Sequence, residues 1–165
     1  MEQTATLRDG TDVTIRPLTA ADGPELVRGL EHLSDRSRYR RFLGTPSFGP
    51  HTLEYLTDVD HHDHEALGAA ETTTGTGIAV ARFIRLQDDP TTAEIAITIA
   101  DAYHRRGLGT LLLDLLATRA REESITTFTG LVLADNTPML RLLSHLGPTR
   151  RRAASAGAVE VEVDL

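Results

Sequence analysis

The fold is decided by Ala93-Glu94-Ile95-Ala96-Ile97-Thr98-Ile99-Ala100, which leads through Asp101 and Ala102 into Tyr103-His104-Arg105-Arg106-Gly107-Leu108-Gly109-Thr110. The first run has isoleucine at every second position with small or polar residues between, a pattern that predicts a β-strand. Beyond the second run, apolar residues recur with the spacing of one helix face: Leu108, Leu111, Leu112, Leu115 and Leu116. The sequence therefore predicts a strand, a Gly-rich turn and a helix packed on a sheet.

The turn between strand and helix favours anion binding. A helix N-terminus carries unpaired N–H groups and the positive end of the helix dipole, and glycine allows an anion to approach closely. The alternative is a plain tight connection in which Arg105 and Arg106 are solvated. The turn is not a dinucleotide fingerprint, since Leu112 stands where the third glycine would be, and it lacks the Gly-Lys-Ser/Thr ending of a Walker loop.

Composition narrows the class of protein. With 165 residues, 40% of them hydrophobic, the chain predicts one globular domain over residues 1–165. It has no cysteine, which excludes disulfides and thiolate chemistry, and its net charge of −7 argues against general nucleic-acid binding. Neither a secretory leader nor an apolar stretch of the roughly 18 residues that span a bilayer is present, so we expect a cytoplasmic protein that does not insert into membranes.

The remaining elements follow from local signals. Alternating runs around Asp9-Gly10 predict an N-terminal hairpin at about 4–18, and helices are expected at 19–33, 34–42 and 50–56, within a helical segment of about 19–57. Strands at 64–71 and 77–86 precede the central strand, in a core of about 64–147. A strand at 126–134, a helix at 137–146 and C-terminal strands at about 149–165 complete an α+β fold, a mixed, mostly antiparallel sheet of about seven strands flanked by helices.

A histidine-rich tract precedes the strand at 64–71. Asp58-Val59-Asp60-His61-His62-Asp63-His64 has three histidines and three carboxylates within seven residues, a composition that can bind a divalent ion. The tract lies in a loop and lacks a second ligand cluster at defined spacing. We therefore expect a polar connection and no metal site.

The quoted stretch resembles the acetyl-coenzyme A signature of the GCN5-related N-acetyltransferases (GNAT), Gln/Arg-x-x-Gly-x-Gly/Ala, with histidine at its first position. The resemblance implies acetyl-CoA as acyl donor, with the pantetheine arm along the backbone of Ile97 and Ile99. It also implies that the diphosphate binds the turn, whose residues are His104, Arg105, Arg106, Gly107, Leu108, Gly109 and Thr110.

A second resemblance lies in residues 133–147. Many family members carry Asn here, then a tyrosine that acts as general acid toward the coenzyme A thiolate, and then Gly. Asn136 and Gly147 match, whereas Leu143 stands in the tyrosine position. The resemblance places Asn136 near the pantetheine, and a pure N-cap role is equally compatible with the sequence. The variant Asn-x-Pro-Met-Leu-Arg-Leu is similar to the bacterial protein-lysine acetyltransferase branch.

In the family that the sequence resembles, the helical segment of about 19–57, before the histidine-rich tract, usually lines the acceptor groove. Its aromatic residues are expected to pack in the core: Tyr39, Phe42, Phe48 and Tyr55. For its arginines, a solvated face and a substrate contact are equally compatible with the sequence: Arg36, Arg38, Arg40 and Arg41.

The reaction requires a neutral amine, and a lysine side chain has a pKa near 10.4, so a general base within reach raises the reactive fraction. Glu94 is the candidate, because it opens the central strand and shares a face with Ala96 and Thr98, whose small side chains leave room for an acceptor. The resemblance agrees, since the branch uses a glutamate at the matching place. A solvated or Arg-paired carboxylate is the alternative.

Together these features predict acetyl transfer from acetyl-CoA to a primary amine, preferably a protein lysine side chain, in a ternary complex. Two alternatives stay open: acetylation of a small-molecule or N-terminal amine, and a non-catalytic acyl-CoA-binding sensor. Expected partners are acetyl-CoA and an amine acceptor, with neither nucleic acid nor membrane, and the protein is expected to be a monomer or homodimer.

Overall fold

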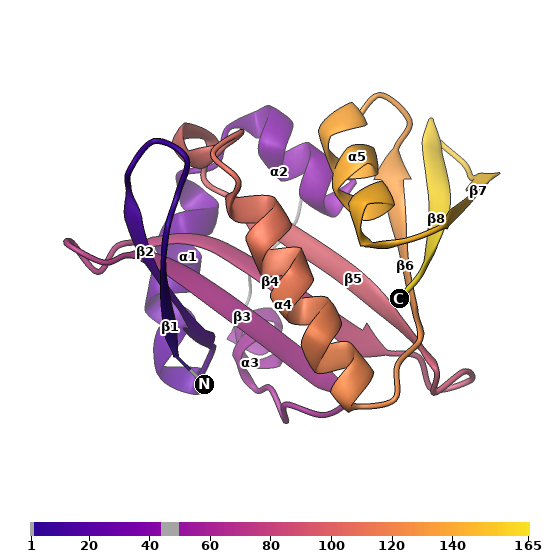
Figure 1. Cartoon of the computed structure of the whole chain (residues 1–165), viewed down its shortest axis with the longest axis horizontal. Helices are drawn as coiled ribbons and strands as arrows, with labels where there is room; N and C mark the ends of the chain where they lie inside the picture. Colours follow the sequence, from indigo (N-terminus) through magenta and orange to yellow (C-terminus); the bar gives the residue numbers. More distant parts are fainter. Residues whose placement is uncertain (1, 44–49) are drawn as a thin grey trace.

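The computed structural model describes residues 2–43 and 50–165, which form one eight-stranded sheet with helices on both faces (Figure 1). Its order is β1-β2-β3-β4-β5-β6-β8-β7, and only the β5–β6 pair is parallel. The strands are β1 (Gln3–Thr6), β2 (Asp12–Pro17), β3 (His64–Glu71), β4 (Gly77–Arg85), β5 (Thr92–Ile99), β6 (Thr127–Leu133), β7 (Thr149–Ala153) and β8 (Ala158–Asp164). The sequence predicts about seven strands and the sheet has eight, with β7 and β8 as the C-terminal strands expected at about 149–165.

Within the described residues, five α-helices and two short 3₁₀ helices connect the strands. They are η1 (Ala20–Asp22), α1 (Gly23–Glu31), α2 (Asp35–Phe42), α3 (Pro50–Thr57), η2 (Asp101–Tyr103), α4 (Leu108–Glu122) and α5 (Thr137–Leu146). The predicted helix at 19–33 is divided. The Asp22 carboxylate accepts the Thr19 N–H at 2.8 Å and closes a 3₁₀ turn, after which Pro24 opens α1. In the described part of the chain, no helix has the length and apolar character needed to cross a bilayer.

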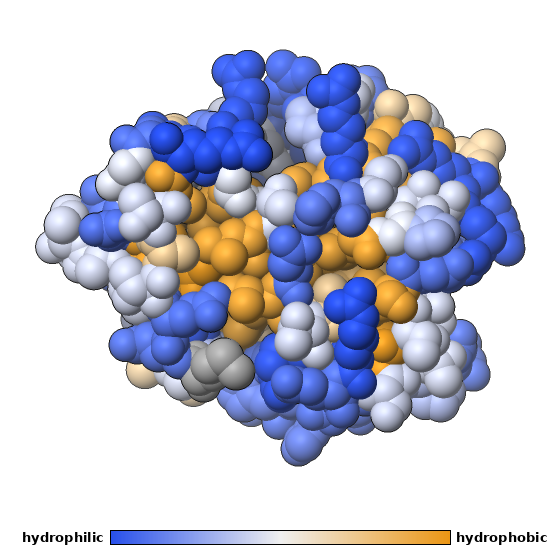
Figure 2. All heavy atoms as spheres, in the orientation of Figure 1, coloured by the Kyte–Doolittle hydropathy of each residue, from blue (hydrophilic) through white to orange (hydrophobic). Residues whose placement is uncertain are grey.

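The two faces of the sheet carry different helices. Helices α4 and α5 cover one face, and α1, α2 and α3 cover the other (Figure 1). The main core lies under α4, where Leu112, Leu113 and Leu116 are fully buried against Phe83 and Phe128. Figure 2, viewed from the α4 side, shows apolar surface on both sides of a polar ridge that follows α4. The central helix thus covers the sheet incompletely.

Strands β5 and β6 separate soon after they meet. Their parallel pairing covers only Thr92–Glu94 and Thr127–Thr129. Just beyond it, a Cβ atom placed on Gly130 would lie 3.4 Å from the C=O oxygen of Ile95, so glycine allows the close approach at the point of separation. The rest of β5 has a free edge toward β6, and Glu94 is its last paired residue. We call this opening the β5–β6 split.

A buried carboxylate ties β3 to the C-terminal half of α4. Glu65 is 1% exposed, and its carboxylate accepts from Arg119 Nε at 3.3 Å and lies 2.8 Å from His61 Nδ1. Glu65 also accepts the N–H of Ala66 at 2.9 Å. This network fixes how α4 lies on the sheet, and α4 carries the Gly-rich turn at its other end.

Glu65→Ala is expected to lower the free energy of unfolding by about 3 kcal/mol, because the substitution removes the buried counter-ion of the partly buried Arg119 and opens a void. Urea unfolding monitored by circular dichroism measures the change. Glu160→Ala, at an exposed position of β8, is the control and should change stability by less than about 0.5 kcal/mol. Equal effects in the two variants would contradict a stabilising role for the network.

Candidate active site

The N-terminus of α4 presents a cradle of backbone N–H groups. Gly107 precedes the helix with φ of +92°, a left-handed conformation that favours glycine. The Leu111 N–H donates to the Gly107 C=O at 3.1 Å, so the N–H groups of residues 107–110 have no partner within the helix. Among the described residues, no side chain caps this end. Free N–H groups and the helix dipole together suit a phosphate anion.

Close packing holds the cradle against the strand. A Cβ atom on Gly109 would lie 3.0 Å from Leu142 Cδ1 and 3.2 Å from Ile99 Cδ1, so glycine lets the helix begin close to β5 and α5. Leu108 is 1% exposed, and its side chain is in the core, which leaves only its N–H for a ligand. Thr110 is partly buried in the same first turn.

The β1–β2 hairpin supports the turn from outside. Arg106 forms an ion pair with Asp9, and its guanidinium lies 4.9 Å from the ring centroid of Tyr103. The Arg8 N–H donates to the Arg106 C=O at 3.1 Å. Arg105 has φ of +60°, and no hydrogen bond or ion pair from the described residues engages its side chain. Of the two predicted arginines, Arg105 is available to an anion, and Arg106 positions the turn.

The backbone of β5 presents donors and acceptors to the split. The Ala100 N–H donates to the Ile78 C=O at 2.8 Å, on the β4 side. Because alternate residues of a strand direct their backbone groups to opposite edges, those of Ile97 and Ile99 point into the split. His104 Nε2 lies 2.9 Å from the Ile99 C=O and donates to it. The imidazole thus joins the turn to the end of β5.

Glu94 lies at the base of the split, beside Thr129 of β6 and Ile84 of β4. It is exposed on the face that carries α2, where it is the negative charge that acts on Arg41. No hydrogen bond from the described residues engages its carboxylate. Glu94 and the backbone of Ile97 are therefore brought together by one strand.

The structure shows the environments of Asn136 and Leu143, the two residues of the second resemblance that bear on the chemistry. Asn136 is the N-cap residue of α5 and is 9% exposed, but its side chain makes no capping hydrogen bond to the described helix. A pure N-cap role is thus not what the structure shows. Leu143 is 1% exposed in the core and carries no titratable group, so it cannot act as an acid.

Asp101 links the acceptor-side helix α2 to the turn. Its carboxylate accepts from the Ser34 N–H at 2.9 Å, from Ser34 Oγ at 3.2 Å and from Ser37 Oγ. The hydrogen bond from Ser37 is the main cause that lowers the pKa of Asp101. Asp101 lies between β5 and the cradle. Sequence reasoning missed this link, because Ser34 is far from Asp101 along the chain.

The prediction of buried aromatic residues in the acceptor-side helices is wrong for two of the four. Tyr39 is 49% exposed and Tyr55 is 55% exposed. Both lie on helices of eight residues, too short and too polar to turn every aromatic ring toward the sheet. Phe42 is partly buried, with the Arg41 guanidinium 4.7 Å from its ring centroid. Phe48 lies outside the described residues.

The arginines of α2 divide by environment. Arg38 donates to the C=O groups of Leu30 and Glu31 at 3.2 Å and holds α1 against α2. Arg36 is exposed, whereas Arg40 and Arg41 are partly buried. Of the two alternatives for these arginines, a solvated position and a substrate contact, Arg36 fits the solvated one.

The histidine-rich tract forms a connection between α3 and β3, as predicted. One carboxylate oxygen of Asp60 accepts the N–H groups of His62, Asp63 and His64 at 2.8 to 2.9 Å. The His62 Nδ1 lies 3.0 Å from a Glu123 carboxylate oxygen, which raises the pKa of His62. These side chains are engaged in holding the loop.

A buried arginine on the Glu94 face was not found from the sequence. Arg82 is 3% exposed on β4, and its Nη1 donates to the Leu56 C=O at 2.9 Å and to His64 Nε2 at 3.2 Å. Burial, and next the positive charge of Arg41, lower the pKa of Arg82 to about 10. The only signal in the sequence was a charged residue inside the otherwise apolar run 77–84.

We expect the free energy of unfolding to decrease as the pH is lowered below about 6.5. Burial, and next the Arg82 charge, lower the pKa of His64, so below 6.5 the unfolded chain takes up a proton before the folded one does. Stability is full above pH 6.5 and is lost as pH falls toward the folded pKa. Urea unfolding at pH 7.5 and 5.5 should show a smaller loss in His64→Gln. An equal loss of stability in both proteins would show that groups other than His64 cause it. His62 is not such a group, because its raised pKa stabilises the folded protein at lower pH.

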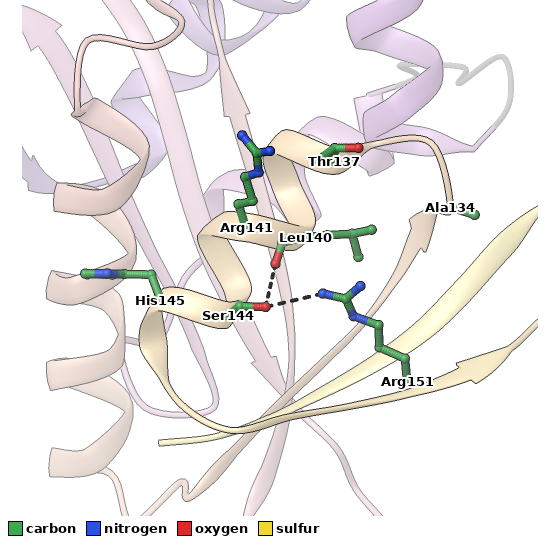
Figure 3. A pocket seen from close by; sticks show the side chains of 7 residues that line it. All are labelled: Ala134, Thr137, Leu140, Arg141, Ser144, His145 and Arg151. Carbon is green, nitrogen blue, oxygen red and sulfur yellow. Dashed lines mark hydrogen bonds between the residues drawn. The ribbon is translucent and has the colours of Figure 1, made fainter.

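A second opening lies between α5 and β7, with a volume of about 540 Å³. Figure 3 shows Arg151 directed at Ser144, its Nη2 3.3 Å from Ser144 Oγ, whereas Arg141 and His145 point away from it. His145 lies 3.2 Å from Asp114 of α4. The polar groups of this opening do not converge, and the β5–β6 split is the better site.

Comparisons with known proteins agree with this geometry. The family model described as Acetyltransferase (GNAT) domain matches residues 12–149. Acetyltransferase Pat of Mycolicibacterium smegmatis is 34% identical over 159 residues, which are 96% of this chain and 47% of Pat. An acetyltransferase of Pseudomonas aeruginosa is 31% identical over 144 residues, 86% of this chain and 77% of that protein. This chain spans about half the length of Pat.

The structure similarity covers nearly the whole chain. The crystal structure of the GNAT domain of S. lividans PAT has a TM-score of 0.88 and 32% identity, and the match covers 99% of this chain and 97% of that one. The α+β architecture expected from the sequence is confirmed. The cradle on α4, the open edge of β5 and the family match together show that this chain belongs to the GNAT family of acetyltransferases, whose acyl donor is acetyl-CoA.

Proposed function

We propose that the protein transfers the acetyl group of acetyl-CoA to the side-chain amine of a protein lysine, with Glu94 as general base. The observation that carries the proposal is the position of Glu94, the last residue of β5 paired to β6, on the strand whose free edge carries Ile97 and Ile99. Similarity to Pat and to S. lividans PAT supports the protein acetyltransferase assignment.

The proposed cofactor site follows the strand and the turn. The N–H groups of residues 107–110 hold the diphosphate, with Arg105 as the cation beside them. The backbone of Ile97 and Ile99 pairs with the pantetheine arm, and Asn136 contributes its side-chain amide, which the cap does not use. His104 and Arg106 support this arrangement through the Ile99 C=O and Asp9.

In the proposed reaction, Glu94 accepts a proton from the lysine ammonium group, directly or through water. The neutral amine attacks the thioester carbonyl, whose oxygen is polarised by a backbone N–H of β5, a contribution worth about 3 kcal/mol in the transition state. Collapse of the intermediate releases coenzyme A thiolate. Leu143 offers no proton, so the second proton of the amine nitrogen, which is lost as the amide forms, passes through water to the thiolate.

Two measurements test the proposal. Calorimetric titration with acetyl-CoA should give micromolar binding, and thiol release should then depend on a lysine-bearing protein mixture. The chain has no lysine among its 17 basic residues, which removes side-chain self-acetylation from the background. Binding with no thiol release on any amine would favour the non-catalytic sensor.

Acetylation of a small-molecule or N-terminal amine is the second candidate function. Turnover of small amines without turnover of folded lysine proteins would favour it. The exposed Tyr39 and Tyr55 of the acceptor-side helices favour a macromolecular acceptor, because exposed aromatic side chains are typical of protein interfaces.

A further inference from the structure

The face of the sheet that carries Glu94 also carries two desolvated cations. Arg82 is 3% exposed and donates to a backbone C=O and to the imidazole of His64. Arg41 of α2 is partly buried, and burial lowers its pKa. The two guanidinium groups are close enough that Arg41 lowers the pKa of Arg82.

The carboxylates on this face of the sheet do not balance the positive charges of Arg41 and Arg82. Glu94 is the carboxylate that acts on Arg41, and within residues 2–43 and 50–165 no carboxylate forms an ion pair with Arg82. Burial, and next the Arg82 charge, lower the pKa of His64, and its imidazole supplies no negative charge in either protonation state. Glu65, the next residue of β3, pairs with Arg119 of α4, on the opposite face. A buried cation without a counter-ion is costly and is usually paired.

The register of the sheet places these cations beside the reacting centre. Arg82 is directly opposite Ala96 on the neighbouring strand, and Ala96 is the residue between Glu94 and Thr98 on that face. Same-face positions on a strand are about 7 Å apart. A ligand whose amine reaches Glu94 therefore has its next few atoms over Ala96, within reach of Arg82 and Arg41.

We propose that Arg41 and Arg82 bind a carboxylate that the acceptor carries near its reactive amine. This inference rests on the proposed function and names its acceptor class: an amine accompanied by an acidic group. The carboxylate has two possible sources, a glutamate or aspartate beside the acceptor lysine of a protein, or the α-carboxylate of a small amino acid. Neighbouring residues of an extended segment are about 3.3 Å apart, so an acidic residue one or two positions from the lysine spans the required distance.

The test compares matched acceptors under acetyl-CoA saturation. One pair is a blocked single-lysine peptide with glutamate two positions from the lysine, and the same peptide with glutamine there. The other pair is Nα-acetyl-lysine and its carboxamide. We expect kcat/KM to be about 10- to 100-fold higher for the acidic member of one pair, the range for a charge-assisted hydrogen bond in a desolvated site. The responding pair identifies the source of the carboxylate.

Three variants assign the preference to the cations. In Arg41→Gln and in Arg82→Gln, the ratio of kcat/KM between the acidic and the neutral acceptor should fall toward one. The affinity for acetyl-CoA should stay unchanged. Arg36→Gln removes the same charge from an exposed position of α2 and should keep the preference. Arg82 is buried, so if Arg82→Gln does not fold by circular dichroism, Arg41→Gln decides.

Different outcomes would overturn carboxylate binding by Arg41 and Arg82 and the acetyltransferase function itself. Equal kcat/KM for both members of each pair, or a preference that persists in Arg41→Gln, would overturn this inference and leave acetyl transfer standing. Tight acetyl-CoA binding with no turnover of any acceptor would overturn the proposed function, and this inference with it. A merely structural role of Arg82 would change stability and would leave the ratio between matched acceptors unchanged.

Discussion

Gly107→Glu is expected to abolish acetyl-CoA binding, with an affinity at least about 100-fold below that of the wild type. Gly107 has φ of +92°, and a side chain in the left-handed region costs about 1–2 kcal/mol. The larger effect is electrostatic, because the new carboxylate lies at the positive end of the α4 dipole, where the diphosphate is proposed to bind. Calorimetric titration of both proteins with acetyl-CoA measures the loss.

A control separates the cradle from backbone strain. Gly75, in the turn between β3 and β4, has φ of +70° and nothing within 4 Å of an added Cβ atom. Gly75→Glu therefore introduces the same charge at a comparably strained position of another turn. It should bind acetyl-CoA normally, and both variants should retain the circular dichroism spectrum of the wild type. Normal affinity in Gly107→Glu would remove the Gly-rich turn from the cofactor site.

The elements that the sequence predicted well are those with strong local signals. The alternation of Ile95, Ile97 and Ile99 gave the central strand to within one residue, and the leucine periodicity gave α4. The two glycines of the turn have separate physical requirements in the structure, a positive φ at Gly107 and close packing at Gly109. Both requirements are local, and so a single sequence can express them.

Features that depend on long-range pairing could not be predicted. The β5–β6 split follows from how two strands distant in the chain diverge after three residues of pairing. The contact of Asp101 with Ser34 and the position of Arg82 opposite Ala96 likewise depend on the register of the whole sheet. The cations beside Glu94 became visible only when α2, β4 and β5 were placed together.

The direction of the Glu94 side chain could be predicted, because side chains alternate across a strand and the isoleucines occupy the core face. Its surroundings could not, because Arg41 comes from a helix more than fifty residues earlier in the chain. The same limit applies to Tyr39 and Tyr55. Aromatic character indicates burial on average, but these two short helices leave such rings exposed.

Glu94→Gln is expected to lower kcat at neutral pH by about 10²- to 10⁴-fold while acetyl-CoA affinity stays nearly unchanged. Glutamine keeps the shape of the side chain and loses the ability to accept a proton from an ammonium group. The cradle at residues 107–110 lies at the other end of β5, so the substitution does not disturb it. Pre-steady-state thiol release with saturating acetyl-CoA separates this chemical step from product release.

The pH dependence gives the sharper test of the same residue. Without a base, the reaction must use the fraction of lysine that is already neutral, which increases tenfold per pH unit up to its pKa near 10.4. The rate of Glu94→Gln should therefore climb with that slope and approach the wild-type rate at high pH. Glu160→Gln, an exposed strand glutamate on β8, should keep the wild-type profile. If Glu94→Gln also keeps that profile, the proton leaves the amine by a route that does not use Glu94, and the base must be sought among waters bound along the split.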